Sequence, residues 1–233
     1  EITTRLVGSE MCIRDRNRKR YLSMVSASDI LFNHGTSVAP LGLIAMKGAE
    51  ELGKKLNEYL VNWAHKGGYD VDTFLIESEC PRFSSGDGKG LIKSTVRGKD
   101  LFIIIDVGNY NVKYQMYDQQ NAMSPDDHYA DVKRIIAAVG GKARRITVIM
   151  PFLYESRQHK RSSRESLDCA IALQELTAMG VENIITFDAH DPRVQNSIPL
   201  HGFETVQPAY QFIKGICKHI KDLQIDSDHM MII

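Results

Sequence analysis

From Leu41 onward, short apolar runs alternate with longer segments of helical periodicity. The run at residues 101–106 is apolar until its final aspartate, which is typical of a strand buried on both faces of a sheet. The longer segments place apolar residues three or four positions apart, and most of them end at a glycine. We expect strands at 73–76, 101–106, 146–150 and 184–188, and helices at 46–63, 125–139, 162–179 and 208–220. This alternation predicts an α/β fold with a largely parallel sheet.

The composition is that of a globular protein with one domain or slightly more. The chain has 233 residues, of which 43% are hydrophobic, and its 29 basic side chains balance 29 acidic ones. Balanced charge excludes a disordered chain, and no apolar run approaches the roughly 20 residues that span a bilayer. Zero net charge gives no general attraction to nucleic acid or anionic lipid, so any bound anion needs a local cluster. The four cysteines show no C-x-x-C spacing, so we expect a cytoplasmic protein with small buried cysteines.

The two ends of the sequence do not follow the alternating pattern. Residues 1–40 show no sustained apolar period and no signal peptide, and we expect them to lie outside the core. Residues 1–16, and 6–16 in particular, read like translated sequencing-adapter sequence rather than encoded protein. The run at 230–233 looks like the start of a buried strand, so we expect the C-terminal part to be missing. The expected division is 1–40 outside the core, a domain at 41–207 and the start of a truncated second domain at 208–233.

The segment after the third expected strand is rich in cations. It runs Arg157-Gln158-His159-Lys160-Arg161 and precedes a helix that we expect to begin at a capping box of Ser162 and Glu165. Cationic side chains next to the free N–H groups of a helix N-terminus suit a polyphosphate. The alternative is a solvated basic turn.

An aspartate and a histidine follow the next strand. Asp188 and His190 are two positions apart on an extended segment, so their side chains point the same way. Such a pair suits a magnesium–nucleotide complex or a developing phosphoryl charge. A purely structural histidine is the open alternative.

Two glycine-containing segments need separate interpretation. Residues 80–90 offer an aromatic side chain with polar neighbours, and an ordinary hairpin turn is the alternative there. Residues 48–55 nearly fit the phosphate-loop pattern, but Lys55 stands where Ser or Thr is required. We interpret residues 48–55 as amphipathic helix.

Together these segments resemble the amino-terminal half of the ribose-phosphate pyrophosphokinase (phosphoribosyl pyrophosphate synthetase) family. The resemblance covers about residues 41–233 and rests on four motifs in the family's order. Residues 82–87 are similar to its Arg-Phe-x-Asp-x-Glu segment, and residues 95–98 to its Ser-Val-Arg-Gly. Residues 154–161 are similar to its ATP-binding Tyr-Ala-Arg-Gln-Asp-Arg/Lys-Lys loop. Asp188-Ala189-His190, with Gln195, is similar to its Asp-Leu-His-x-x-Gln signature.

The resemblance implies a phosphoribosyltransferase-like sheet with helices on both faces. It also implies transfer of the diphosphoryl group of ATP to ribose 5-phosphate, with Mg²⁺, in a homo-oligomer that is a hexamer in the family. The implied ATP-phosphate ligands are Arg157, Gln158, His159, Lys160 and Arg161. The implied metal ligands are Asp188 and His190, with His190 also catalytic. Phe83, Ser85 and Asp87 would serve the adenine of a neighbouring subunit. A regulatory phosphate would contact Thr95, Arg97 and Arg164.

Several positions depart from the family pattern. Ser85 replaces an aspartate, Asp87 a glutamate and His159 an acid, and Asn196-Ser197 stand in place of Gly-Phe-Phe. The segment 107–124 is also longer than usual. Because the family's ribose-5-phosphate loop and basic catalytic loop fall beyond this sequence, we expect the chain alone to be inactive. The alternative is a non-catalytic regulatory homologue that binds nucleotide or sibling subunits. A dinucleotide-binding Rossmann domain is disfavoured, since no G-x-G-x-x-G follows a strand.

Overall fold

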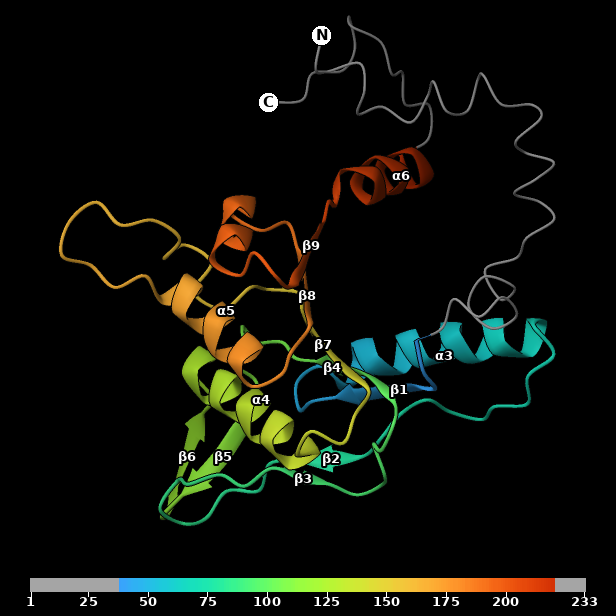
Figure 1. Cartoon of the computed structure of the whole chain (residues 1–233), viewed down its shortest axis with the longest axis horizontal. Helices are drawn as coiled ribbons and strands as arrows, with labels where there is room; N and C mark the ends of the chain where they lie inside the picture. The colour runs from blue at the N-terminus through green and yellow to red at the C-terminus, as the bar shows by residue number, and fades with distance from the viewer. Residues whose placement is uncertain (1–37, 221–233) are drawn as a thin grey trace, which may run out of the picture.

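A five-stranded parallel sheet forms the centre of the protein, which we describe from a computed structural model covering residues 38–220 (Figure 1). The sheet order is β1-β4-β7-β8-β9, and every neighbouring pair is parallel. The strands are β1 (Leu41–Ala45), β4 (Asp100–Ile104), β7 (Arg145–Met150), β8 (Asn183–Phe187) and β9 (Gly202–Val206). The expected parallel α/β fold is confirmed. The expectations for residues 1–37 and for a strand at 230–233 lie outside the described residues.

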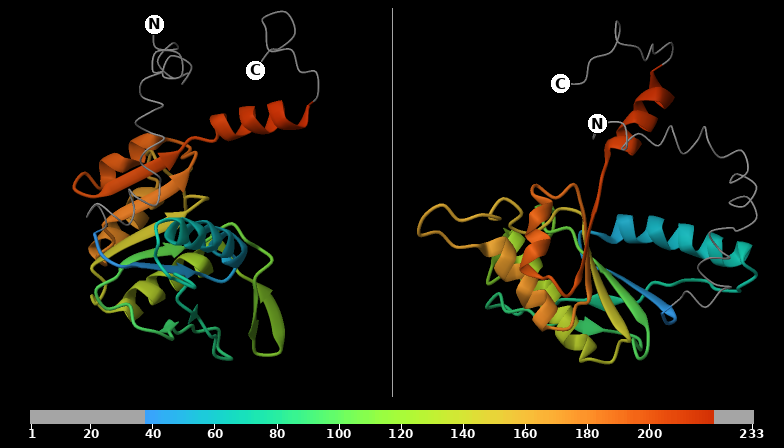
Figure 2. Two further views of the ribbon diagram at one scale, coloured as in Figure 1. Left: turned by 90° about the vertical axis from the view of Figure 1, so that its right-hand side faces the viewer. Right: turned by 45° about the horizontal axis from the view of Figure 1, so that its top comes forward.

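Helices cover both faces of the sheet (Figures 1 and 2). The two helices α4 (Pro125–Val139) and α5 (Asp168–Ala178) pack on one face, and α3 (Glu50–Lys66) packs on the other. Leu52, Leu56 and Leu60 of α3 lie against the cluster formed by Leu43, Ala49 and Ile104. The larger core on the opposite face contains the remaining buried side chains of β4, β7 and β8. The expectation that 48–55 belongs to a helix rather than a phosphate loop agrees with α3.

The helix α4 begins at a capping box that the sequence analysis did not name, whereas α5 does not begin at the box that was expected for it. Ser124 accepts a hydrogen bond from the Asp127 backbone N–H at 3.1 Å, and the Asp127 carboxylate accepts from the Ser124 N–H at 2.9 Å. At the expected box of α5, the Glu165 carboxylate accepts from the Ser162 N–H at 3.2 Å, yet the helix begins only at Asp168. The prediction of a helix from 162 is wrong, because this side chain closes a local turn instead of capping a helix.

Several strands of the structure differ from those expected from the sequence. The expected strand at 73–76 is wrong, because only a single bridge pairs Leu75 with Leu43. The sheet strands β1 and β9 were not expected, and β9 is half exposed at the sheet edge, so it carries no continuous apolar run. Two antiparallel hairpins are also present: β2 (Ser78–Glu79) with β3 (Leu91–Ile92), and β5 (Lys113–Met116) with β6 (Gln119–Ala122). The first agrees with the hairpin-turn alternative for residues 80–90, whereas the second was not expected. The long segment 107–124 therefore contains the second hairpin.

The chain reverses its direction of winding between β1 and β4. The Leu43 N–H donates to Phe74 O at 2.9 Å and Leu43 O accepts from the Ile76 N–H at 2.8 Å, which puts the 74–76 segment beside β1. Since β4 pairs with β1 as well, β1 lies between that segment and β4. The helix before the reversal, α3, and the helix after it, α4, accordingly lie on opposite faces. The sheet therefore has a topological switch point between the carboxyl ends of β1 and β4.

The last described helix, α6 (Ala209–His219), matches the expected helix at 208–220. It has no buried residue and lies apart from the sheet in both figures. A second domain beginning at 208 stays a prediction. None of the helices within residues 38–220 is long and apolar enough to cross a membrane.

Candidate functional site

Two of the predicted segments meet at the carboxyl ends of β7 and β8. These strands are parallel neighbours, so the loop at 151–167 and the residues from 188 onward leave the same edge of the sheet. The ring centroids of His159 and His190 lie 5.1 Å apart in an edge-to-face arrangement. The structure therefore brings the cation-rich segment and the Asp-x-His segment together.

The cations of the first segment are free to bind a ligand. Arg157, Lys160 and Arg161 are exposed, and their side chains have no hydrogen-bond or ion-pair partner among residues 38–220. The backbone beneath them is held, since the Gln158 N–H donates to Glu155 O at 2.8 Å and Gln158 O accepts from the Cys169 N–H at 3.3 Å. Unpaired guanidinium and ammonium groups on an anchored backbone suit phosphate oxygens.

Tyr154 anchors the base of this loop. Its ring stacks on Tyr129, with centroids 4.3 Å apart and planes 4° apart, and its hydroxyl donates to Asp126 Oδ1 at 2.7 Å. Burial, and then the hydrogen bond to Asp126, raise the pKa of the Tyr154 hydroxyl, so it stays a neutral donor at physiological pH. Next to it, Glu155 has a φ of 53°. The loop thus leaves β7 through a strained left-handed residue held by a stacked tyrosine.

Asp188 lies at the corresponding exit from β8. Its φ is 47°, in the left-handed region that non-glycine residues rarely adopt. The edge strand β9 holds this conformation, because the Asp188 N–H donates to Val206 O at 3.0 Å and the Ala189 N–H donates to Thr205 Oγ1 at 2.9 Å. The carboxylate of Asp188 and the ring of His190 are both exposed. Left-handed residues therefore occur directly after β8 and within the loop that follows β7, as is common at functional sites.

An aspartate that the sequence analysis did not single out links the two segments. Asp191 Oδ2 lies 3.4 Å from His159 Nε2, and Arg193 donates to the same carboxylate through Nε at 2.9 Å and Nη2 at 2.5 Å. The hydrogen bonds from Arg193 hold the pKa of the Asp191 carboxyl well below its usual range. The His159 side chain thus faces a carboxylate that is ionised at any physiological pH. No periodicity or motif in the sequence pairs positions 159 and 191.

The donor set fits a magnesium ion that is held mainly by a nucleotide. Within residues 38–220, no three His, Cys, Asp or Glu side chains gather in a way that could hold a metal by themselves. Magnesium sites often use one or two carboxylates, with water and substrate phosphates supplying the other oxygens. The exposed carboxylate of Asp188, at the same edge of the sheet as the unpaired cations, matches that kind of site. The imidazole of His190 is a poorer magnesium ligand and better suited to contact phosphate oxygens.

The predicted adenine-contact residues lie on the hairpin loop between β2 and β3. Phe83 is 58% exposed, and the Ser85 hydroxyl donates to Asp87 Oδ2 at 2.7 Å. Figure 1 shows this hairpin well away from the loop at 151–167. One chain therefore does not bring these residues to its own β7–β8 edge, so their predicted role requires a second copy. Arg82 of the same motif points inward instead and pairs with Asp131 at 2.6 Å.

The predicted regulatory residues are divided between the two ends of the sheet. Thr95 and Arg97 lie in the loop that enters β4, where Thr95 Oγ1 accepts from the Arg97 N–H at 3.3 Å. Arg164 lies in the loop that leaves β7, which runs parallel to β4. A phosphate site shared by the three residues would need two chains.

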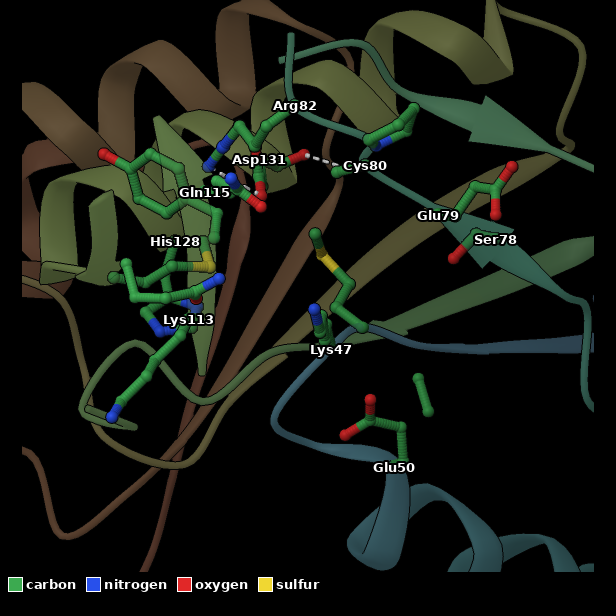
Figure 3. A pocket seen from close by; sticks show the side chains of 16 residues that line it. Lys47, Glu50, Ser78, Glu79, Cys80, Arg82, Lys113, Gln115, His128 and Asp131 are labelled. Carbon is green, nitrogen blue, oxygen red and sulfur yellow. Dashed lines mark hydrogen bonds and ion pairs between the residues drawn. The ribbon is translucent and has the colours of Figure 1, made fainter. Parts of the chain in front are cut away.

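Two cavities lie near the topological switch point rather than at the β7–β8 edge. The first has a volume of about 590 Å³ and is bounded by the end of β1, β2 and the β5–β6 hairpin (Figure 3). The second, of about 630 Å³, includes Asp106, Asn109 and the start of α3. Neither is lined by a residue predicted to bind ATP or metal.

Comparison with known proteins agrees with the motifs. The sequence model of the N-terminal domain of ribose phosphate pyrophosphokinase matches residues 41–180. Ribose-phosphate pyrophosphokinase 1 of Candida albicans is 27% identical over 157 residues, 66% of this chain and 45% of that protein. Ribose-phosphate pyrophosphokinase of Chlorobaculum tepidum is 25% identical over 198 residues, 83% of this chain and 50% of that protein. The chain thus spans about half the length of these curated relatives.

A solved structure shares the fold. Phosphoribosylpyrophosphate synthetase from Mycobacterium smegmatis superposes with a TM-score of 0.59 at 20% identity, over 77% of this chain and 52% of that one. The parallel sheet with helices on both faces is therefore the fold of that synthetase. With the sequence match over residues 41–180, the chain belongs to the family of the N-terminal domain of ribose phosphate pyrophosphokinase.

Proposed function

We propose that this chain is the ATP-binding half of a ribose-phosphate diphosphokinase. The observation that carries the proposal is the meeting of the 157–161 segment with His190 at one edge of the sheet, where His159 and His190 lie 5.1 Å apart. Three unpaired cations and an exposed aspartate belong to segments that leave this edge. Such an arrangement supplies what phosphoryl transfer requires, which is charge neutralisation and alignment rather than a covalent intermediate.

In the proposed reaction, the anomeric hydroxyl oxygen of ribose 5-phosphate attacks the β-phosphorus of ATP. The bond from that phosphorus to the α-phosphate oxygen breaks, AMP leaves, and the hydroxyl proton is lost to solvent or a base. Arg157, Gln158 and Lys160 bind the phosphates, while His190 contacts the oxygens on which charge develops. Magnesium, held by Asp188 and the phosphates, would neutralise charge on the transferred group. Ribose 5-phosphate would bind to a part of the protein outside the residues described here.

We further propose a cytoplasmic homo-oligomer in which Phe83, Ser85 and Asp87 reach the adenine of a neighbouring copy. Phe83 is exposed on a loop distant from the β7–β8 edge of its own chain. A ring so exposed is available to a partner, and burying it there would favour association.

Binding of magnesium ATP to the 233-residue chain tests the proposal. We expect weak binding in calorimetry that falls as salt rises, because the contacts are ionic. The double variant R157A/K160A should lose binding, whereas K142M, at the opposite end of the sheet, should retain it. Equal binding by wild type and R157A/K160A would contradict the proposal. We expect no phosphoribosyl pyrophosphate from this chain alone.

A non-catalytic regulatory homologue is the second candidate. It is favoured by His159, which replaces an acid of the family motif and here faces Asp191 at 3.4 Å. Both candidates are compatible with nucleotide binding, and the second can instead bind sibling subunits, so the discriminating measurement is product formation by the protein encoded by the complete gene. Formation of AMP and phosphoribosyl pyrophosphate supports the enzyme, and nucleotide binding without product supports the regulator.

A further inference from the structure

The cavity of about 590 Å³ lies at the topological switch point of the sheet. Ala45, Met46 and Lys47 at the carboxyl end of β1 form one wall, and the β5–β6 hairpin, which follows β4, forms the wall opposite (Figure 3). In open parallel α/β sheets, ligands bind in the crevice where the winding direction reverses. The volume also lies within the range of small-molecule sites. The cavity therefore has the position and size of a ligand site separate from the β7–β8 edge.

Three cations and three carboxylates line this cavity, and they differ in whether they have partners. Arg82 and Asp131 neutralise each other at 2.6 Å, and Glu79 Oε2 lies 3.2 Å from Lys93 Nζ. Glu50 Oε2 accepts from the Gly48 N–H at 2.6 Å. By contrast, the ammonium groups of two lining lysines have no hydrogen-bond or ion-pair partner in the part of the chain that the structure describes; these are Lys47 and Lys113. Arg134 also pairs with Asp131, and Lys93 is shared with Glu77, so the lining residues together with these partners carry five cations against four carboxylates. The two unpaired ammonium groups are the charges available to an anion.

Neutral hydrogen-bonding groups complete the lining. Gln115 of β5 and Gln120 of β6 are directly opposite each other across the hairpin, and both line the cavity. Ser78 adds a hydroxyl from β2. The side chains of these three residues also have no partner within residues 38–220. Paired carboxamides and a hydroxyl can bind the hydroxyl groups of a sugar or the edge of a base.

The hairpin wall is fixed in place, so the cavity is preformed. The Tyr117 N–H donates to Ser84 O at 2.8 Å, and the Arg82 guanidinium lies 5.1 Å from the centroid of the Tyr114 ring. His128, buried in the cavity floor, has its Nε2 2.9 Å from Asn109 O. The same contacts join the hairpin to the loop that carries Phe83.

We propose that this cavity binds an organic phosphate, with Lys47 and Lys113 on the phosphate and Gln115 and Gln120 on the sugar or base. Two lysines match the charge of a phosphate monoester, which is close to a dianion at neutral pH. The proposal does not depend on the function of the β7–β8 edge, because the two sites share no residue. Sugar phosphates and nucleoside monophosphates offer the same chemistry, and the test separates them.

Calorimetry on the 233-residue chain with three probes tests the proposal: inorganic phosphate, glucose 6-phosphate and AMP. We expect at least one organic probe to bind more tightly than inorganic phosphate. Replacing either lysine, as K47M or K113M, should weaken that binding about tenfold or more, the effect of losing one charge-assisted hydrogen bond. The pair Q115L/Q120L should weaken the organic probe and leave inorganic phosphate unchanged. K142M is the matched control for loss of a lysine, and circular dichroism checks that each variant is folded.

Three results would overturn the proposal. The first is no binding by any probe. The second is organic-probe binding that is lost in R157A but kept in K113M, which would assign the ligand to the β7–β8 edge. The third is equal binding of inorganic and organic phosphate with no effect of Q115L/Q120L, which would reduce the cavity to a simple anion site. ATP binding by the wild type and by R157A/K160A is measured separately, so the two proposals can fail independently.

Discussion

Replacing Asp131 with asparagine should destabilise the fold by about 3 kcal/mol. The Asp131 carboxylate accepts from Arg82 Nη1 at 2.6 Å and Nη2 at 3.0 Å, and from Arg134 Nη1 at 2.6 Å. The side chains of Arg82 and Asp131 are only 6% and 8% exposed. Removing the charge leaves the Arg82 guanidinium buried without a counter-ion, whereas Arg134, at 32% exposure, can turn to water.

The magnitude follows from what each variant leaves behind. Losing one partner of a buried ion pair costs about 3–5 kcal/mol, and we take the lower end because an amide keeps the shape and one acceptor. R82M should cost less, about 2 kcal/mol, because Asp131 keeps its bond to Arg134. The double variant R82M/D131N leaves no unpaired buried charge and should be more stable than the sum of the two single effects predicts.

Urea unfolding followed by circular dichroism measures these differences. With a slope of about 2–3 kcal/mol/M, D131N should lower the midpoint by about 1–1.5 M. E77Q is the control, because it breaks an exposed ion pair with Lys93 and should cost less than about 1 kcal/mol. If D131N cost no more than E77Q, or if the double variant showed no favourable coupling, the argument from the buried pair would be refuted.

Three further predictions concern a cap, the cysteines and His190. S124A should destabilise the protein by about 1 kcal/mol in the same urea assay, because it removes the helix cap of α4; S162A, where no helix begins, should cost less. Alkylation by iodoacetamide near pH 8 should modify the exposed Cys217 much faster than Cys80. Burial and then the charge of Asp131 raise the pKa of the Cys80 thiol to about 12, so its reactive thiolate forms only well above neutral pH. Equal alkylation rates of the two cysteines would contradict this prediction. In the protein from the complete gene, H190A should lower turnover about 10²-fold with little change in the thermal midpoint, because the ring is exposed and packs only edge-to-face on His159; a normal rate in the folded variant would remove His190 from the site.

The buried part of the fold was predictable because its signals are local. The runs behind β4, β7 and β8 are mostly apolar, and the helix at 125–139 matches α4, whose apolar periodicity ends at a glycine. The edge strand β9 and the β5–β6 hairpin are largely exposed, so neither leaves an apolar pattern to detect. Their positions depend on contacts with segments distant in sequence.

The residues of the candidate site also differ in how far the sequence alone could predict them. Residues 157–161 and 188–190 could be proposed because each follows an apolar strand, and parallel strands expose their carboxyl ends at one edge. The pairing of Asp191 with His159, and the inward turn of Arg82, depend on side-chain directions that no spacing encodes. The cavity at the topological switch point could not be predicted either, because locating it requires knowing that residues near 75 lie beside β1.

The parallel pairing of β1 has a consequence for synthesis on the ribosome. Leu41 pairs with Asp100, so 59 further residues must be made before β1 finds its neighbour in the sheet. At about 5–20 residues per second, the strand waits on the order of 3–12 s after it has been translated. During that interval only the short bridge at Leu75 can occupy its other edge. The apolar segment Leu41–Ala45 is therefore the part of the nascent sheet most exposed to misassociation, and the part that a chaperone would have most reason to bind.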